Sequence, residues 1–248
     1  MLKAFLKQML QARGIEAQHI QPAGTAPRPI GRTFNILEDV RARGFMPQLV
    51  FDLGANNGGW TKIAAQILQG ARFVLVEPLP RMQPALTAMA QSNPRYSVVA
   101  AAVGGAPGSA MLTDWDTGST ILPVDAAGAS QTTVAVTTLD ALAGQWGVPD
   151  FVKVDVEGLE LEALQGAGSI LGKTELFVIE VALFRFVNRP VLHDVVAFMA
   201  EHGYWVYDVG DPIRRPFDGA LGLLDLFFSR RDGELHRWEQ AWYSESSK

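Results

Sequence analysis

The fold is decided by the stretch Leu49-Val50-Phe51-Asp52-Leu53-Gly54-Ala55-Asn56-Asn57-Gly58-Gly59-Trp60. An apolar run that ends in an acid predicts a buried strand, and the turn that follows it is rich in glycine and asparagine. The segment from Trp60 onward then has the apolar spacing of a helix. In an open α/β sheet, ligands bind just past the carboxyl end of such a strand. The glycines let the backbone approach a ligand, and the first N–H groups of the helix are free to bind an anionic group.

The spacing of this turn argues against a dinucleotide ligand. The dinucleotide fingerprint is G-x-G-x-x-G, whereas the turn here has Asn56 at the position of the second glycine. Asp52 at the strand end would also repel a pyrophosphate in a low-dielectric cleft. A ligand that carries an ammonium, a carboxylate and a sulfonium suits this acid better. A strand, a glycine turn and a helix can also be a plain connection, so both interpretations stay open at this point.

The composition of the 248 residues excludes several classes of protein. The net charge of −5 is not the basic footprint of a nucleic-acid-binding protein. The absence of cysteine excludes disulfides, a thiolate nucleophile, cysteine-bound zinc and iron–sulfur clusters, and four histidines disfavour a histidine metal cage. No apolar stretch approaches the ~20 residues of a membrane span, and no signal peptide is evident. We therefore expect a cytoplasmic protein without a nucleic-acid partner or a membrane span.

The first 48 residues are expected to form an N-terminal helical extension. Residues 2–10 have apolar side chains at helical spacing, and Thr33 is a candidate N-cap for a second helix over residues 34–43. The first helix is open to a membrane surface or a partner, but its few basic residues favour docking on the chain's own core or on a second copy in a homodimer. Residues 49–231 are expected to form the main domain, and residues 232–248 a C-terminal tail.

Apolar runs alternate with helical patterns through the main domain. Further strands are expected over residues 72–78, 96–103, 150–158, 175–181, 204–209 and 223–230. This alternation predicts an α/β fold with a doubly wound, mostly parallel sheet of seven strands. Alternating, β-branched segments at residues 109–113 and 132–138 flank a loop of small residues, which predicts a ribbon or lid inserted into the sheet.

Glu77 is the candidate ribose-binding residue. It ends the second strand, 25 residues after Asp52, which is where a βαβ unit places a carboxylate against a ribose. One carboxylate can accept hydrogen bonds from both ribose hydroxyls. The alternative is a solvated acid before Pro78, but the strand, the acid and the spacing together favour ribose binding.

Two groups of motifs resemble a known family. Asp52, the turn that follows it and Glu77 resemble the cofactor half of class I S-adenosylmethionine-dependent methyltransferases of the Rossmann-like type. The second half is similar to the FkbM family in the segments Thr137-Thr138-Leu139-Asp140-Ala141-Leu142, Val152-Lys153-Val154-Asp155-Val156-Glu157-Gly158-Leu159-Glu160, Leu164-Gln165-Gly166-Ala167 and Ile179-Glu180-Val181, and in Asp225. Members of that family are mostly O-methyltransferases that act on hydroxyls of sugars, polyketides and other natural products.

The resemblance implies a role for each motif. The methionine part of S-adenosylmethionine would lie at the turn, the ribose at Glu77 and the adenine near the end of the third strand. The implied cofactor-binding residues are Asp52, Gly54, Asn56, Asn57, Gly58, Glu77, Pro78, Ala102, Val103 and Asp155. The implied catalytic residues are Asp155, Glu157 and Glu180.

Methyl transfer to a hydroxyl requires alignment of the acceptor, exclusion of water and a base. The candidate bases are Asp155, Glu157, Glu180 and His193, and we favour Asp155 with Glu157 as its partner. The two carboxylates also suit Mg²⁺, although a metal-free site is favoured. Alternatively, they cap the following helix and pair with Lys153.

Three further questions stay open in the sequence. A nucleotide-dependent oxidoreductase shares the strand, the turn and the ribose acid, and a non-catalytic relative would keep the fold as a binding module. The acceptor is expected to be a hydroxylated small molecule. Its pocket is expected from the N-terminal segment, residues 115–130 and residues 183–189, where Arg185 and Arg189 would suit an anionic substituent.

Overall fold

The computed structural model describes residues 31–114, 119–121, 130–185 and 189–236. The helix expected over residues 2–10, most of the small-residue loop and most of the C-terminal tail lie outside the described residues.

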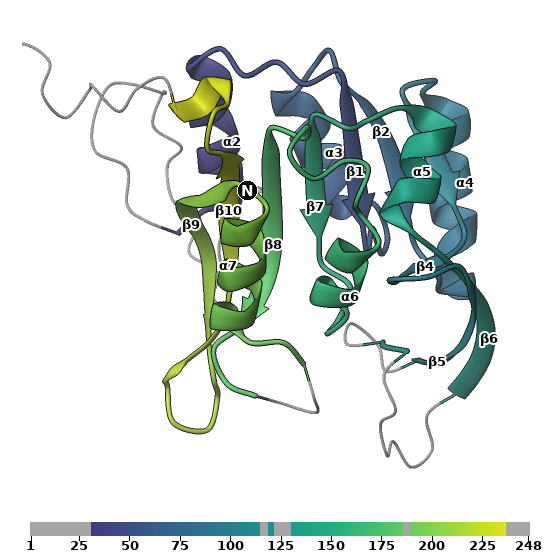
Figure 1. The fold of residues 1–248 in the computed structure, drawn as a ribbon. Helices are drawn as coiled ribbons and strands as arrows, with labels where there is room; N and C mark the ends of the chain where they lie inside the picture. Colours follow the sequence, from purple (N-terminus) through teal and green to yellow (C-terminus); the bar gives the residue numbers. More distant parts are fainter. Residues whose placement is uncertain (1–30, 115–118, 122–129, 186–188, 237–248) are drawn as a thin grey trace, which may run out of the picture.

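A seven-stranded sheet forms the centre of the molecule (Figure 1). The order across it is β3-β2-β1-β7-β8-β10-β9. The strands are β1 (Leu49–Leu53), β2 (Arg72–Val76), β3 (Tyr96–Val99), β7 (Phe151–Val154), β8 (Leu176–Ala182), β9 (Tyr204–Arg214) and β10 (Leu221–Arg230). The first five are parallel, whereas β10 is antiparallel to both β8 and β9. The expected doubly wound, mostly parallel sheet of seven strands is confirmed, and its winding reverses between β1 and β7.

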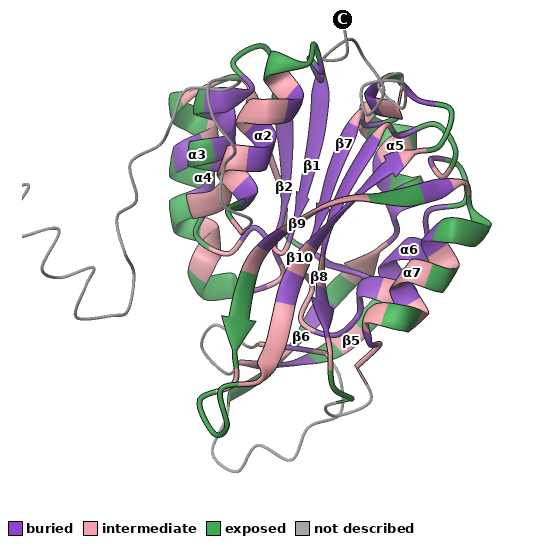
Figure 2. Cartoon of the chain, turned by 90° about the vertical axis from the view of Figure 1, so that its left-hand side faces the viewer, coloured by how far each residue is buried: buried purple, intermediate pink, exposed green. Residues whose placement is uncertain are grey.

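Helices cover both faces of the sheet (Figures 1 and 2). One face carries α2 (Thr33–Ala42), α3 (Gly59–Ile67) and α4 (Gln83–Ser92), and the other carries α5 (Leu139–Trp146), α6 (Glu160–Gln165) and α7 (Leu192–Glu201). Short 3₁₀ helices span Pro80–Met82 and Glu234–His236. Because alternate strand residues point to opposite faces, β1 sends Phe51 into one apolar core and Val50 into the other.

Helix α2 shares the core of the sheet. Ile36, Leu37 and Val40 are buried against Val50 and its neighbours, which makes α2 part of the same body as β1. The division into residues 1–48, 49–231 and 232–248 stays a prediction. Within the described residues, no helix is long and apolar enough to cross a membrane.

The strand expected over residues 96–103 is interrupted, and this prediction was wrong in its boundary. β3 ends at Val99, where the Ala101 N–H turns back to donate to the Val99 carbonyl at 3.1 Å. Residues 102 and 103 form β4 (Ala102–Val103), which belongs to a second sheet. No glycine or proline marks this turn, so the apolar run reads as one strand.

The inserted ribbon is a sheet of its own rather than part of the main sheet. Its order is β4-β6-β5, with β5 (Gly108–Asp114) antiparallel to β6 (Ser130–Thr137). Figure 1 shows it beside the carboxyl ends of the parallel strands. Its position there allows it to form a wall of a site at this end of the main sheet.

The last two strands form a longer hairpin than the sequence indicates. β9 extends to Arg214 and β10 begins at Leu221, so the strands continue past the residues expected to connect them. Figure 2 shows that β9, at the edge of the sheet, is exposed toward its end, where Pro212, Ile213 and Arg214 lie. Pro212 is tolerated there because an edge strand has a side without partner strands.

Candidate functional site

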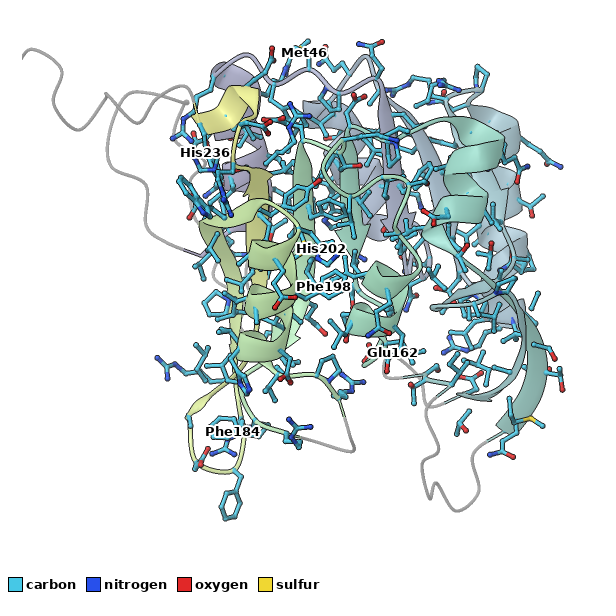
Figure 3. All side chains as sticks on the ribbon, viewed as in Figure 1. Met46, Glu162, Phe184, Phe198, His202 and His236 are labelled. Carbon is cyan, nitrogen blue, oxygen red and sulfur yellow. The ribbon has the colours of Figure 1, made fainter. Side chains whose placement is uncertain are left out.

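A cavity of about 250 Å³ lies at the carboxyl end of the parallel strands. Figure 3 marks this direction, because Met46 precedes β1 at one end of the molecule and Phe184 follows β8 at the other. The expected site residues that line the cavity are Gly54, Asn56, Glu77, Pro78, Ala102, Val103, Asp155, Glu157 and Glu180. The expected residues that do not line it are Asp52, Asn57, Gly58 and His193.

The turn after β1 is shaped by packing as well as by any ligand. Gly54 has a φ of +73°, and a Cβ atom there would overlap the carbonyl oxygen of Asp155. Gly58 has a φ of +75°, and its Cβ would lie 2.7 Å from the sulfur of Met89. Asn57 stabilises the turn itself, because its Oδ1 accepts the N–H of Gly59, the first residue of α3, at 2.9 Å. Gly54 and Gly58 are therefore needed for the packing of the turn against Asp155 and Met89, whether or not a ligand is bound.

Glu77 is fixed on the cavity wall. Its side chain is held by two backbone N–H groups, with Oε2 at 2.7 Å from the Asn56 nitrogen and Oε1 at 2.9 Å from the Leu79 nitrogen. Burial raises the pKa of Glu77, and these two hydrogen bonds lower it in part. Each oxygen keeps a second lone pair, which is what a pair of ribose hydroxyls needs.

A buried lysine links β1 to the segment after β7. Lys153 Nζ lies 3.3 Å from Oδ1 of Asp52 and 3.2 Å from Oδ2 of Asp155. Burial alone would lower the pKa of Lys153, but the carboxylates of Asp155 and Asp52 outweigh it and hold that pKa above its usual value. Lys153 is therefore a permanent cation under the floor of the site.

Asp52 is fully buried at the end of β1. Its Oδ2 accepts the Thr61 hydroxyl of α3 at 2.5 Å, and its Oδ1 makes the ion pair with Lys153 but no aligned hydrogen bond. The expected contact of Asp52 with the cofactor stays a prediction. Its observed partners give it a structural role, which is to neutralise the buried lysine.

Glu157 is held from two sides in a strained conformation. Its φ is +54°, which is unfavourable for a side chain without a special local interaction. Its Oε2 lies 2.6 Å from Nη2 of Arg189, and its carbonyl accepts the Thr120 hydroxyl at 2.9 Å. Burial raises the pKa of Glu157, and Arg189 counteracts this. Arg189 is thus engaged by the protein, and Glu157 joins the second sheet to the segment after β8.

The turn into α6 is held by Glu160. Its Oε1 accepts the Gly158 N–H at 2.9 Å and the Val156 N–H at 3.2 Å, and burial raises its pKa to about 7. The carboxylates of Asp155 and Glu157 instead bind Lys153 and Arg189. Of the alternative role weighed for these two acids, the lysine pairing of Asp155 is observed, whereas no side chain caps α6 and Glu160 holds the turn that precedes it.

The two remaining candidate bases differ in position. Glu180 of β8 lines the cavity, and its side chain forms no hydrogen bond or ion pair with any residue that the structure describes. Burial raises the pKa of Glu180 to about 9, and the carboxylates around it add to the shift. His193 is 77% exposed on α7, with Nε2 at 3.1 Å from Asp194, and lies outside the cavity wall.

Several hallmark segments are structural. The Thr138 hydroxyl caps α5 by accepting the Ala141 N–H at 3.1 Å. Oδ1 of Asp140 accepts the N–H and hydroxyl of Ser169, at 2.7 and 2.6 Å. A Cβ atom on Gly166 would lie 2.6 Å from the carbonyl oxygen of Gly104. These residues join α5 to the segment after α6.

Part of the cavity wall was missed by sequence reasoning. Leu112 comes from β5 of the second sheet. Ser119, Thr120 and Ile121 also line the cavity, and they belong to residues 115–130, which were expected to line the acceptor pocket. The alternation of β5 indicates that Leu112 is buried, but nothing in the sequence indicates which site it covers. Among the described residues, no three histidine, aspartate or glutamate side chains are grouped to bind a metal ion.

A protein-family model matches the part of the chain that carries most of the cavity wall. The model described as the Methyltransferase FkbM domain matches residues 52–206, from the end of β1 into β9. The chain belongs to the FkbM methyltransferase family. It is thus an S-adenosylmethionine-dependent methyltransferase, and the oxidoreductase alternative is set aside.

The walls of the FkbM cavity fit this methyl donor. Glu77 offers a fixed carboxylate for a ribose, while Ala102, Val103 and Leu112 offer apolar surface for a flat ring. Asp155 supplies a carboxylate on the cavity wall, which suits a cationic ligand. When bound, the donor supplies an activated methyl group.

Solved structures of methyltransferases are similar to this chain in fold. The 1,6-didemethyltoxoflavin-N1-methyltransferase of Burkholderia thailandensis has a TM-score of 0.47 and 15% identity, over 80% of this chain and 78% of that one. The precorrin-6y C5,15-methyltransferase of Geobacter metallireducens has a TM-score of 0.47 and 12% identity, over 84% and 95%. A putative rRNA methylase of Clostridium thermocellum has a TM-score of 0.49 and 10% identity, over 82% and 100%. No curated protein matches the sequence.

Proposed function

We propose that this FkbM domain transfers a methyl group to a hydroxyl of a small molecule, a sugar or another hydroxylated natural product. The observation that carries this proposal is Asp155. It lines the cavity, its side chain is 34% exposed, and Lys153 holds one of its oxygens from below. A carboxylate that is both anchored and accessible is what a hydroxyl acceptor requires of a general base.

The site residues divide between the two ligands. Glu77 would bind the ribose hydroxyls of the donor, and Gly54 and Asn56 would lie along its methionine part. Asp155 would accept the hydroxyl proton of the acceptor, and Lys153 would keep the carboxylate in place. Glu157, held by Arg189, would form the wall next to Asp155. The second sheet and its loop contribute Leu112 and Ile121 to the cavity, and these side chains would help to exclude water.

Replacing Asp155 by asparagine is expected to lower turnover by about 100-fold or more, because a general base contributes about 10²–10⁴ to the rate. S-adenosylhomocysteine, the demethylated donor, should still bind with little change. The measurement is S-adenosylhomocysteine release with a panel of hydroxylated compounds, and calorimetry for binding. Asp232→Asn, on an 85% exposed aspartate, is the matched control. Turnover that is unchanged in the Asp155 variant would remove this residue from the mechanism.

Replacing Glu77 by glutamine is expected to weaken S-adenosylhomocysteine binding by about 10-fold or more, because a hydrogen bond to a charged group contributes about 1.5–3 kcal/mol. Calorimetry measures the affinity, and the melting temperature without ligand shows how far the turn itself is weakened. Glu201→Gln, at an exposed end of α7, is the control. Equal affinities of wild type and variant would exclude Glu77 from the ribose site.

The remaining expectations about partners and location stay predictions. The absence of a nucleic-acid partner is expected from the net charge of −5, and a homodimer and a cytoplasmic location are likewise predictions from the sequence alone.

A further inference from the structure

A row of polar side chains crosses the main sheet near its carboxyl edge. On β1 and β7, Asp52 lies opposite Lys153, and on β8 and β10, Glu180 lies opposite Asp225. Residues that are paired across strands point to the same face of a sheet. The Thr61 hydroxyl of α3 donates to Asp52, which belongs to this row. The row therefore lies on the face of the sheet that α2 and α3 cover.

The acids that flank Glu180 each have a partner. Asp155 has Lys153 at 3.2 Å, and Glu157 has Arg189 at 2.6 Å. On the other side, Oδ2 of Asp225 accepts the Thr33 hydroxyl at 2.6 Å. Thr33 begins α2, and its N–H donates to Asp211 at 3.1 Å. Lys153 and Arg189 are thus engaged by other carboxylates.

Glu180 stands between these acids without a partner of its own. The acidic groups that act on it are Asp155, Glu157, Glu160 and Asp225. A further negative charge would be half-buried among them and would have no counterion. The carboxyl group avoids this by keeping its proton. Its exposed part faces the cavity, where a ligand is the available hydrogen-bond partner.

We propose that Glu180 acts as a neutral carboxylic acid that donates a hydrogen bond to an oxygen of the methyl acceptor. Asp155 directly follows β7, and Glu180 lies on β8, the neighbouring strand. Neighbouring strands are about 4.8 Å apart, so one acceptor molecule can contact both side chains. Asp155 would bind the hydroxyl that is methylated, and Glu180 the neighbouring oxygen. The acceptor class is therefore a compound with two adjacent oxygen functions, such as a vicinal diol. This inference rests on the proposed function, and it replaces the role of base that the sequence leaves open for Glu180.

Infrared spectroscopy tests the protonation without any acceptor. At pH 8, Glu180 should hold its proton, since its pKa is raised to about 9, whereas Glu160 and Asp225, with pKa values of about 7 and 6, should be largely ionised. The wild type should show the carbonyl band of a protonated carboxyl group, and Glu180→Gln should lack it. The band should persist when S-adenosylhomocysteine saturates the protein and should fade above pH 9.

Two results would overturn the proposal. One is a spectrum at pH 8 that does not differ between wild type and Glu180→Gln. The other is loss of the band on addition of S-adenosylhomocysteine, which would assign Glu180 to the ammonium group of that ligand. Failure of the proposed function gives a different pattern, since no hydroxylated compound would then be methylated while the infrared band stayed in place.

Turnover provides a second, separate test. Glu180→Gln keeps an N–H donor and should stay within about 10-fold of wild type at neutral pH, because one hydrogen bond is exchanged for another. Glu180→Leu removes the donor and should raise KM for a vicinal diol more than for the matching mono-alcohol. Equal KM changes for the two acceptors would contradict the proposed contact.

The pH dependence of stability gives a third expected result. The pKa of Glu180 is higher in the folded protein, at about 9, than its ordinary value of 4.5, so its protonated form stabilises the fold fully below about pH 4.5. This contribution is lost as the pH rises toward 9. Relative to Glu180→Gln, the wild type should therefore show a falling urea midpoint from about pH 5 to pH 9. Parallel curves would exclude the shifted carboxyl group, since Glu160 and Asp225 are common to both proteins.

Discussion

Gly54→Ala is expected to destabilise the protein by about 4 kcal/mol or more, or to prevent folding. The added Cβ would overlap the carbonyl oxygen of Asp155, and the backbone φ of +73° is itself unfavourable for alanine. The overlapped atom belongs to the backbone, so it cannot move away as the end of a flexible side chain can. Urea unfolding followed by circular dichroism measures the loss, and the soluble yield reports a variant that does not fold.

Gly144→Ala provides the matched control for this substitution. Gly144 lies inside α5, where an added Cβ would meet no atom within 4 Å. Alanine should stabilise this helix by about 0.5–1 kcal/mol. If the Gly54 variant lost less than about 1 kcal/mol, the turn would be free to shift away from Asp155, and packing would not explain the glycine.

Lys153→Met is expected to destabilise the fold by about 3–5 kcal/mol. It leaves Asp52 as a fully buried carboxylate with the Thr61 hydroxyl but without its cation, and breaking a buried pair by removing one partner has a cost of this size. It also frees Asp155, so turnover should fall together with stability. Urea unfolding at neutral pH measures the first effect, and S-adenosylhomocysteine release measures the second.

A double variant separates the two effects. Asp52→Asn combined with Lys153→Met removes both buried charges and should regain at least half of the lost stability. Turnover should stay low, because Asp155 is still without its lysine. Lys173→Met, on an exposed lysine that binds the Ser169 carbonyl, should change stability by less than about 0.5 kcal/mol. A double variant no more stable than the single one would show that the charge on Asp52 is not what Lys153 neutralises.

Local patterns in the sequence predict the main sheet and the place of Glu77 at the cavity well. β1 and its turn are recognisable because an apolar run, an acid and glycines follow one another within twelve residues. Glu77 is recognisable because β2 ends there, and the structure holds its carboxylate on the cavity wall. Both features depend on residues close together in the chain, which periodicity and turn chemistry describe directly.

Contacts between residues far apart in the chain could not be predicted from local patterns in the sequence. The reason for Gly54 is a carbonyl about a hundred positions later, and the interruption after Val99 depends on pairing with β6. Glu157 and Glu180 look equivalent as acids at strand ends. Arg189 neutralises the first, whereas the second has no partner among the described residues. Which acid keeps a proton is decided by these neighbours and not by the local motif.

The second sheet also bears on how the acceptor specificity of such an enzyme can change during evolution. It leaves and re-enters the fold at one place, since the Gly104 N–H donates to the Thr137 carbonyl at 3.0 Å. The residues between these two points form a cassette outside the main sheet, so a change in it need not alter the register of β1, β2 and β7. Exchange of this cassette between family members is therefore a route by which evolution, or an engineer, can redirect methylation to a new acceptor. Asp155 and Glu180, the acids proposed to contact the acceptor, lie outside this segment and would stay in place.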